Sequence, residues 1–311
     1  MTFKIPEGMK LGAPVLRVRN VDAVLGFYEN NLGLQVNKRY RSIEEEEEED
    51  DGDGGNLIYE LGFKQKEPST QEPLLILNHD PAATIPSSDS AGLFHFAILV
   101  PDRKSLAFTY LALRNSGVRY DGFADHLVSE SLYLRDPENN GIEIYRDIPA
   151  IEWPRDSEGH IMMDTLPLDL NSLSAEMNNV EDGRRNNAKA FPAGARIGHI
   201  HLRVTNLERS IKFYHQKIGL DITLNWSSMG AAFLSAGGYH HHIGMNTWHS
   251  LNGKSHRSRE AGLENFTINI PDKSIVRALV SNIYGVNFAQ KNQNQLFIPD
   301  PDGITFLIRS Q

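Results

Sequence analysis

One sequence pattern begins four times along this chain. Each copy is a short apolar segment that ends in Asn or Asp and leads into a stretch with helical spacing, at 13–20, 95–102, 199–206 and 265–272. In a repeat of this kind each copy is one unit, and it buries its apolar face only against another unit. The 311 residues therefore predict four related modules.

Each module is expected to contain a strand, a helix and about three further strands. The apolar spacing changes from a period of two to a helical period after each first strand. Helices are expected at 21–28, 105–115 and 207–214. The later strands are expected at 57–61, 74–77, 131–134, 142–145, 231–235, 240–245 and 304–308. Asp-Pro turns at 136–137 and 300–301 precede the last strands of the second and fourth modules.

A single module leaves one sheet edge unpaired and one apolar face uncovered. Two modules side by side remove both problems by forming a larger curved sheet around a cleft. We therefore expect an α+β protein in which four βαβββ modules form two paired-module domains with curved mixed sheets. The expected division is an N-terminal domain at 1–150, a polar connector at 151–192 and a C-terminal domain at 193–311.

Composition excludes several classes of protein. The absence of cysteine removes disulfides, zinc–thiolate sites and cysteine nucleophiles. The acidic run 44–51 supplies eight of the nine net negative charges, and we interpret it as a solvated loop rather than a partner-binding or metal-collecting segment. Without a basic stripe, nucleic acid is not an expected partner. Without a long apolar run or a signal-peptide core, we expect a cytoplasmic protein that does not bind membranes, and a homo-oligomer stays open.

Several motifs resemble those of the vicinal oxygen chelate superfamily, which includes glyoxalase I, extradiol ring-cleaving dioxygenases and fosfomycin-resistance proteins. The motifs typical of the superfamily lie at 136–143, 198–199, 210–214 and 219–220. The segments 92–102 and 237–244 resemble the bacterial catechol-2,3-dioxygenase group within it. The resemblance covers nearly the whole chain apart from the acidic loop and the connector, and it implies metal-dependent chemistry on a small molecule.

The resemblance also implies where metal ligands lie. One ligand position is near the start of the first strand of a module, where the four copies have Ala13, His95, His199 and Asn265. A second position lies six residues after the turn proline, where the second and fourth modules have Glu143 and Leu307. The ligand set is then His95, His199 and Glu143. Two imidazoles and one carboxylate suit non-haem Fe(II), and Mn(II) fits the same ligands. The alternative is that both histidines are ordinary strand residues.

The position of these ligands departs from a common pattern of the family. In many extradiol dioxygenases all three ligands come from the C-terminal pair of modules, whereas here that pair keeps only His199. Either the second and third modules pack directly against each other, or no functional metal site survives. We expect direct packing, because the three ligands complement one another.

Further histidines and a tyrosine are candidates for catalysis and substrate binding. His241 lies three residues before Gly244, as the acid/base histidine of extradiol enzymes lies before a small residue. The resemblance similarly suggests Tyr133 and His126 as groups that contact the substrate oxygens. We expect His201, His240 and His242 to line the substrate pocket, with strand alternation placing His240 and His242 on one face and His241 on the other. The alternatives are a core tyrosine and a surface or core cluster of imidazoles.

Three functions are compatible with these observations. The favoured one is an extradiol dioxygenase that cleaves a catechol-type aromatic diol with O2. A glyoxalase-like isomerase or lyase would use the metal to polarise a carbonyl without oxygen, although such sites generally have four protein ligands. A metal-free binding protein of the antibiotic-resistance type would retain no metal. The sequence leaves the individual substrate and the choice between iron and manganese open.

Overall fold

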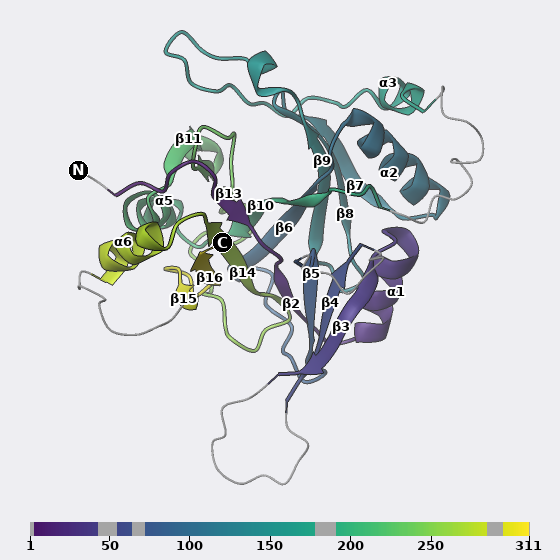
Figure 1. Ribbon diagram of the computed structural model, residues 1–311, viewed down its shortest axis with the longest axis horizontal. Helices are drawn as coiled ribbons and strands as arrows, with labels where there is room; N and C mark the ends of the chain where they lie inside the picture. The colour runs from purple at the N-terminus through teal and green to yellow at the C-terminus, as the bar shows by residue number, and fades with distance from the viewer. Residues whose placement is uncertain (1–2, 43–54, 64–71, 178–190, 285–294, 311) are drawn as a thin grey trace.

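The strands of this protein form two mixed sheets. The computed structural model describes residues 3–42, 55–63, 72–177, 191–284 and 295–310. The acidic run 44–51 lies outside these described residues. The two sheets are curved and lie beside each other (Figure 1). This arrangement confirms the expected α+β fold of paired modules.

The first sheet combines strands from both ends of the chain. In spatial order its strands are β15 (Gln295–Pro299), β16 (Thr305–Ser310), β14 (Gly262–Ile270), β2 (Val15–Val18), β5 (Leu75–His79), β4 (Leu57–Gly62) and β3 (Gln35–Arg41). The short strand β1 (Lys10–Leu11) also pairs with β14. These strands belong to the first and fourth modules.

The second sheet is built in the same way from the middle of the chain. In spatial order its strands are β11 (Asp221–Trp226), β12 (Ala231–Ser235), β13 (Ile243–Asn246), β10 (Arg196–Arg203), β6 (Gly92–Leu99), β9 (Gly141–Asp147), β8 (Ser129–Arg135) and β7 (Tyr120–Asp125). These strands belong to the second and third modules.

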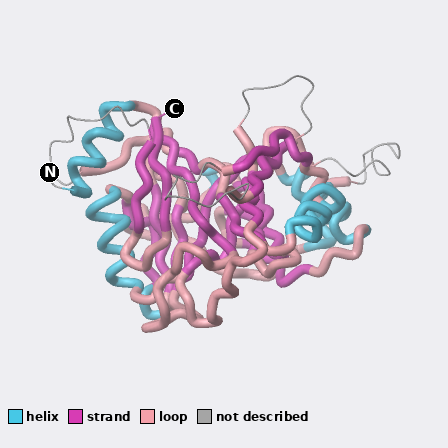
Figure 2. The backbone as a smooth tube through the Cα atoms, turned by 90° about the horizontal axis from the view of Figure 1, so that it is seen from below, coloured by secondary structure: helices cyan, strands magenta, loops and turns pink. Residues whose placement is uncertain are grey.

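The helices cover the outer sides of the sheets, with the strands between them (Figure 2). They are α1 (Val21–Asn31), α2 (Arg103–Asn115), α3 (Leu170–Ala175), α5 (Leu207–Lys212) and α6 (Lys273–Tyr284). Short helical turns occur at Ala150–Glu152, Phe213–Ile218 and Ser227–Met229. No helix in the described part of the chain is long and apolar enough to cross a membrane.

Hydrogen bonding groups the modules differently from the predicted division at 1–150 and 193–311. The first strand of module two, β6, pairs antiparallel with the first strand of module three, β10. The equivalent strands of modules one and four, β2 and β14, pair in the same way. Each half of the chain therefore contributes to both sheets. In each sheet, the first strand of one module covers the free edge of the first strand of a module from the other half of the chain. Modules two and three therefore pack directly against each other, as the predicted ligand set requires.

The Asn or Asp that ends each repeated segment caps the helix that follows. The side chains of Asn20, Asp102 and Asn206 each accept a hydrogen bond from the backbone N–H three residues later. Asp272 accepts one from the N–H of Ser274. Such a cap satisfies an amide that would otherwise lack a partner at the helix N-terminus. The repeat is therefore conserved between modules in its local chemistry as well as in its apolar pattern.

A hydrogen bond between a buried tyrosine and a turn aspartate occurs twice and connects the two sheets. The buried hydroxyl of Tyr28 in module one donates to Asp136 in the turn of module two, and Tyr214 in module three donates to Asp300 in the turn of module four. Each aspartate also accepts backbone N–H groups within its own turn. These bonds tie module one to two and module three to four, although the pairs lie in different sheets.

Two sequence predictions need correction. The strand expected at 240–245 begins only at Ile243, because Gly237 and Gly238 both adopt positive φ and turn the chain before it. The strands β3, β7, β11 and β15, each the first after a helix, were not predicted. Most of their side chains are only partly buried or exposed, so their apolar alternation is weak.

The buried turn aspartate of module four gives a prediction about stability and pH. Burial raises the pKa of Asp300 from 3.8 to about 7. A carboxyl whose pKa is raised by folding stabilises the fold at low pH, and this contribution is lost as the pH rises through the folded pKa. The free energy of unfolding of Asp300→Asn, relative to wild type, should therefore increase between about pH 4 and 7, by at most about 4 kcal/mol.

Urea unfolding across this pH range measures the effect. Asp22→Asn, which removes an exposed carboxylate of α1, is the control. A difference between Asp300→Asn and wild type that stays constant with pH would contradict the prediction.

Candidate metal centre

The three predicted ligands lie on three neighbouring strands. His95 lies on β6, His199 on β10 and Glu143 on β9, in the spatial order β10, β6, β9. His95 pairs across the antiparallel ladder with His201, and Ala97 of β6 pairs with Glu143. All three ligand side chains are buried. The pairing of β6 with β10 therefore brings together side chains from the two halves of the chain.

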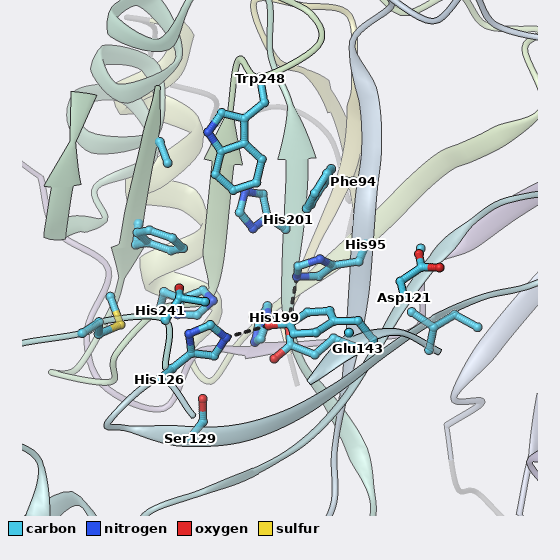
Figure 3. Close-up of a pocket in the computed structure, with 18 of the residues that line it drawn as sticks. Phe94, His95, Asp121, His126, Ser129, Glu143, His199, His201, His241 and Trp248 are labelled. Carbon is cyan, nitrogen blue, oxygen red and sulfur yellow. Dashed lines mark hydrogen bonds and ion pairs between the residues drawn. The ribbon is translucent and has the colours of Figure 1, made fainter. Parts of the chain in front are cut away.

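The donor atoms of these side chains converge on one point (Figure 3). Nε2 of His95 and Nε2 of His199 each lie 2.9 Å from Oε2 of Glu143. The ligand atoms all lie within 4.8 Å of one another, and this is the one such group of His, Asp and Glu in the described residues. His199 hydrogen-bonds the carboxylate, but Nε2 of His95 is buried without a hydrogen-bond partner. An unsatisfied buried nitrogen aimed at a carboxylate fits a metal ligand.

The protonation states also suit metal binding. Burial alone would raise the pKa of Glu143, but His199 and His95 outweigh it and hold the pKa well below its usual range. Burial lowers the pKa of His199 despite the neighbouring Glu143. An ionised carboxylate and a neutral imidazole are the forms that bind metals. The hydroxyl of Ser131 donates to Oε1 of Glu143 at 2.7 Å, which leaves Oε2 directed at the histidines.

A pocket of about 380 Å³ opens onto these three residues. Its wall is mostly apolar and aromatic, with Phe94, Phe233 and Trp248 among the lining residues. Phe94 and Trp248 make an edge-to-face contact with ring centroids 5.3 Å apart. Residues 163–165 of the predicted connector also line the pocket. A cavity of this size and character suits a small, largely apolar molecule with a few polar groups.

Two of the predicted substrate-contacting residues form a hydrogen-bonded pair in the pocket wall. The hydroxyl of Tyr133 lies 2.7 Å from Nε2 of His126, and Nδ1 of His126 lies 2.7 Å from the carbonyl oxygen of Asp164. Because a carbonyl only accepts, His126 donates through Nδ1 and, when neutral, accepts from Tyr133 through Nε2. Burial and the nearby Glu143 raise the pKa of Tyr133 well above its usual range, so the phenol stays protonated.

His241 lines the pocket and contacts His199, with ring centroids 4.1 Å apart. Behind it, Nδ1 of His241 lies 2.8 Å from Nδ1 of His240, and Nε2 of His240 lies 2.9 Å from a carboxylate oxygen of Asp147. Burial, with His199 alongside, holds the pKa of His241 well below its usual range. The result is a chain of two imidazoles that ends on a carboxylate.

His201 also lines the pocket, beside His95. Its Nε2 accepts a hydrogen bond from the side-chain amide of Asn246 at 3.0 Å. Burial, followed by the proximity of His95, lowers its pKa well below the usual range, so the ring is neutral. Gly244 makes room for this ring, because a Cβ there would lie 2.9 Å from Nδ1 of His201.

His240 and His242 lie outside the pocket lining, contrary to the prediction that they bind substrate. His240 is directed at Asp147, and Nδ1 of His242 lies 2.8 Å from the hydroxyl of Ser235. The strand alternation used for the prediction does not apply to them, because β13 begins only at Ile243.

The repeated ligand position is vacated in the sheet of modules one and four. It holds Ala13 and Asn265, and Leu307 occupies the position equivalent to Glu143. Leu307 pairs with Thr267 in the ladder between β14 and β16. Among the described residues, this sheet contains no cluster of three or more His, Asp or Glu side chains that could hold a metal ion.

Sequence reasoning missed several residues of the site. Ser131 precedes the predicted Tyr133 by two positions on the same strand, so strand alternation could have identified it. Phe94 neighbours His95 and reaches the pocket at an irregularity of β6. Asp147 and Asp164 carry no local signal, because their contacts depend on tertiary structure.

Comparison with known proteins identifies the class of this protein. Residues 10–144 and 196–308 match the sequence profile of the Glyoxalase/Bleomycin resistance protein/Dioxygenase superfamily. The chain belongs to this superfamily.

Individual relatives narrow the comparison. The chain is 35% identical over 309 residues to a catechol-2,3-dioxygenase of Bacillus subtilis (strain 168). This alignment covers 98% of this chain and 99% of that protein. Among solved structures, a candidate dioxygenase of Bacillus subtilis has a TM-score of 0.58 at 14% identity, over 99% of this chain and 85% of that one. Glyoxalase I of Zea mays has a TM-score of 0.52 at 15% identity, over 97% and 92%. These two structural similarities show the shared fold.

The convergent donors predict how metal retention depends on single residues. We expect His95→Ala, His199→Ala and Glu143→Ala each to abolish retention of Fe(II) or Mn(II), because each removes one of three ligands. Asn265→Ala, at the same register of module four, should retain the metal as wild type does. Elemental analysis after anaerobic purification and dialysis measures this, and wild-type metal content in any of the first three variants would refute the site.

Proposed function

We propose that this protein is an extradiol ring-cleaving dioxygenase that acts on a catechol-type aromatic diol with O2. The observation that carries the proposal is the buried set of His95, His199 and Glu143, which opens onto an aromatic pocket. Two imidazoles and one carboxylate leave coordination positions free for substrate, and they suit Fe(II) or, as the alternative, Mn(II). The similarity to a named catechol-2,3-dioxygenase supports the same reaction class.

The residues around the ligands would define the chemistry of the centre. A bound Fe(II) would supply the means to activate O2 and to hold both oxygens of a diol. Ser131 keeps the carboxylate of Glu143 oriented towards the two histidines through its 2.7 Å hydrogen bond. Outer hydrogen bonds of this kind fix ligand geometry and tune metal affinity.

The pocket wall would orient an aromatic ring. Phe94, Phe233 and Trp248 offer apolar and aromatic surface, which excludes water from the ring carbons. The protonated phenol of Tyr133 and its partner His126 also line the pocket. The Tyr133 proton is donated to His126, and both ring nitrogens of His126 are already hydrogen-bonded. The phenolic oxygen of Tyr133 can therefore accept a hydrogen bond from a diol hydroxyl. We propose His201, neutral and buried, as a further contact to the substrate.

His241 would move protons between the substrate and the reacting oxygens. When both rings are neutral, Nε2–H of His240 donates to Asp147, so Nδ1 of His240 accepts from Nδ1–H of His241. The free Nε2 of His241 is then the proton-accepting atom. Asp147 and His240 act as positioning residues that hold this tautomer, as a carboxylate does for a catalytic imidazole in other enzymes.

The assay follows directly from the proposed reaction. Anaerobically purified protein loaded with Fe(II) should consume one O2 per catechol and form a yellow ring-opened product. Oxygen uptake and absorbance with a panel of substituted catechols measure this. A fully loaded enzyme that leaves every catechol unchanged would refute the proposal, and metal-dependent turnover of another substrate without O2 would favour a glyoxalase-like isomerase.

Variants of the histidine chain should separate catalysis from metal binding. We expect His241→Asn to retain metal and to lower kcat about 10²- to 10⁴-fold, because a positioned acid/base contributes this much. Asp147→Asn should lower kcat by a smaller factor with little change in KM, because it removes the charge that holds His240. Asp156→Asn, an exposed carboxylate of the segment after β9, is the control. Wild-type kcat in metal-loaded His241→Asn would contradict this role.

A further inference from the structure

A second cleft lies where the ends of β6, β10 and β14 meet the loops 80–91 and 249–261. Its volume is about 960 Å³, and it shares no lining residue with the metal pocket. The two cavities adjoin along the chain, since Leu93 lines one and Phe94 the other. Nothing in the proposed dioxygenase reaction uses the second cleft.

The second cleft contains an arginine that forms no ion pair with the described residues. Within the described residues the side chain of Arg203, at the end of β10, makes no hydrogen bond or ion pair, and its Nε is buried without a partner. Burial, with Arg135 nearby, lowers the pKa of Arg203 against the opposing effect of Glu260. A guanidinium nevertheless stays charged in proteins. A partly buried charge without a partner is costly, so its retention needs a reason.

The repeat provides an internal comparison for this arginine. Arg17 occupies the same register in module one, since Arg17 pairs with Gly262 as Arg203 pairs with Gly92. Arg17 is neutralised inside the protein, with Nη1 2.9 Å from Asp80 and Nη2 2.9 Å from Glu264. The sheet of modules one and four therefore supplies its own counter-charges.

Both counter-charges are replaced by aromatic residues in the other sheet. Glu264 lies two residues after Gly262, and Phe94 lies two residues after Gly92. Asp80 lies two residues after the ladder partner of Arg17, and Trp248 lies two residues after Asn246, the ladder partner of Arg203. The aromatic substitutions that line the metal pocket thus leave Arg203 unpaired in the adjoining cleft.

Other polar groups face the same space. A Cβ on Gly92 would lie 3.9 Å from Nη2 of Arg203 and 3.8 Å from Nδ1 of His256, so the glycine leaves both groups accessible from one point. Two acidic residues oppose an anion there. Glu260 lies 3.8 Å from His256, and Glu138 already accepts two backbone N–H groups.

We propose that the second cleft binds a small anionic molecule through a carboxylate or phosphate group held by Arg203. The planar guanidinium offers paired N–H donors that match either group, and the ligand supplies the counter-charge that Asp80 and Glu264 give to Arg17. The size of the cleft accommodates a ligand larger than the anionic group itself.

Calorimetric titration of the full chain with inorganic phosphate and with succinate, at constant ionic strength in chloride, tests the proposal. We expect saturable binding of at least one probe to wild type and to Arg119→Gln, an exposed-arginine control. Arg203→Gln should bind that probe at least about tenfold more weakly, as expected for loss of a charge-assisted pair. Which probe binds distinguishes a phosphate ligand from a carboxylate ligand.

A second pair of variants tests the same inference without removing the arginine. Trp248 is 51% exposed, so its replacement is compatible with folding. Trp248→Asp restores an acid at the position equivalent to Asp80 and should weaken probe binding about as much as Arg203→Gln. Trp248→Asn is the uncharged control and should bind as wild type does.

Three results would overturn the proposal: no saturable binding of either probe to wild type, equal binding to Arg203→Gln, or equal effects of Trp248→Asp and Trp248→Asn. The titrations need neither metal nor catechol. Their outcome is therefore independent of the proposed ring-cleaving activity.

Discussion

The antiparallel pairing of β6 with β10 is the contact on which the rest of the site depends. It places His95 and His199, which are more than a hundred positions apart in sequence, on neighbouring strands. Glu143 joins them because β9 lies on the other side of β6. The helices and the cross-sheet Tyr–Asp bonds then hold the modules around this ladder. A centre built in this way requires both halves of the chain, because each half contributes only part of the ligand set.

The two sheets show how one architecture supports different chemistry through a few side chains. In the sheet of modules one and four, arginine and two acids form ion pairs, and the ligand positions hold Ala13 and Asn265. In the other sheet, histidines occupy the ligand positions and aromatic residues replace the acids. The same backbone register therefore gives an ion-paired arginine in one sheet, and in the other sheet a metal pocket with an unpaired arginine in the adjoining cleft.

Much of this organisation could be predicted from sequence because the repeat carries it. Counting along the repeat placed His95, His199 and Glu143 at positions that the structure brings together. The pairing of modules two with three followed only from the ligand set, since apolar patterns do not say which strand edges meet. The roles of His240, Asp147 and Asp164 could not be predicted, because a positive-φ turn displaces one and tertiary contacts define the others.

The first sheet also has a consequence for how the chain folds. Arg17 near the N-terminus pairs with Gly262 near the C-terminus, so this sheet has contacts of very high sequence separation. Closing such long loops carries an entropic cost that local contacts do not repay, and folding slows accordingly. During synthesis, the edge of β2 that pairs with β14 stays uncovered until β14 has left the ribosome. The sheet without metal ligands therefore assembles only after both the first and the fourth modules have been synthesised.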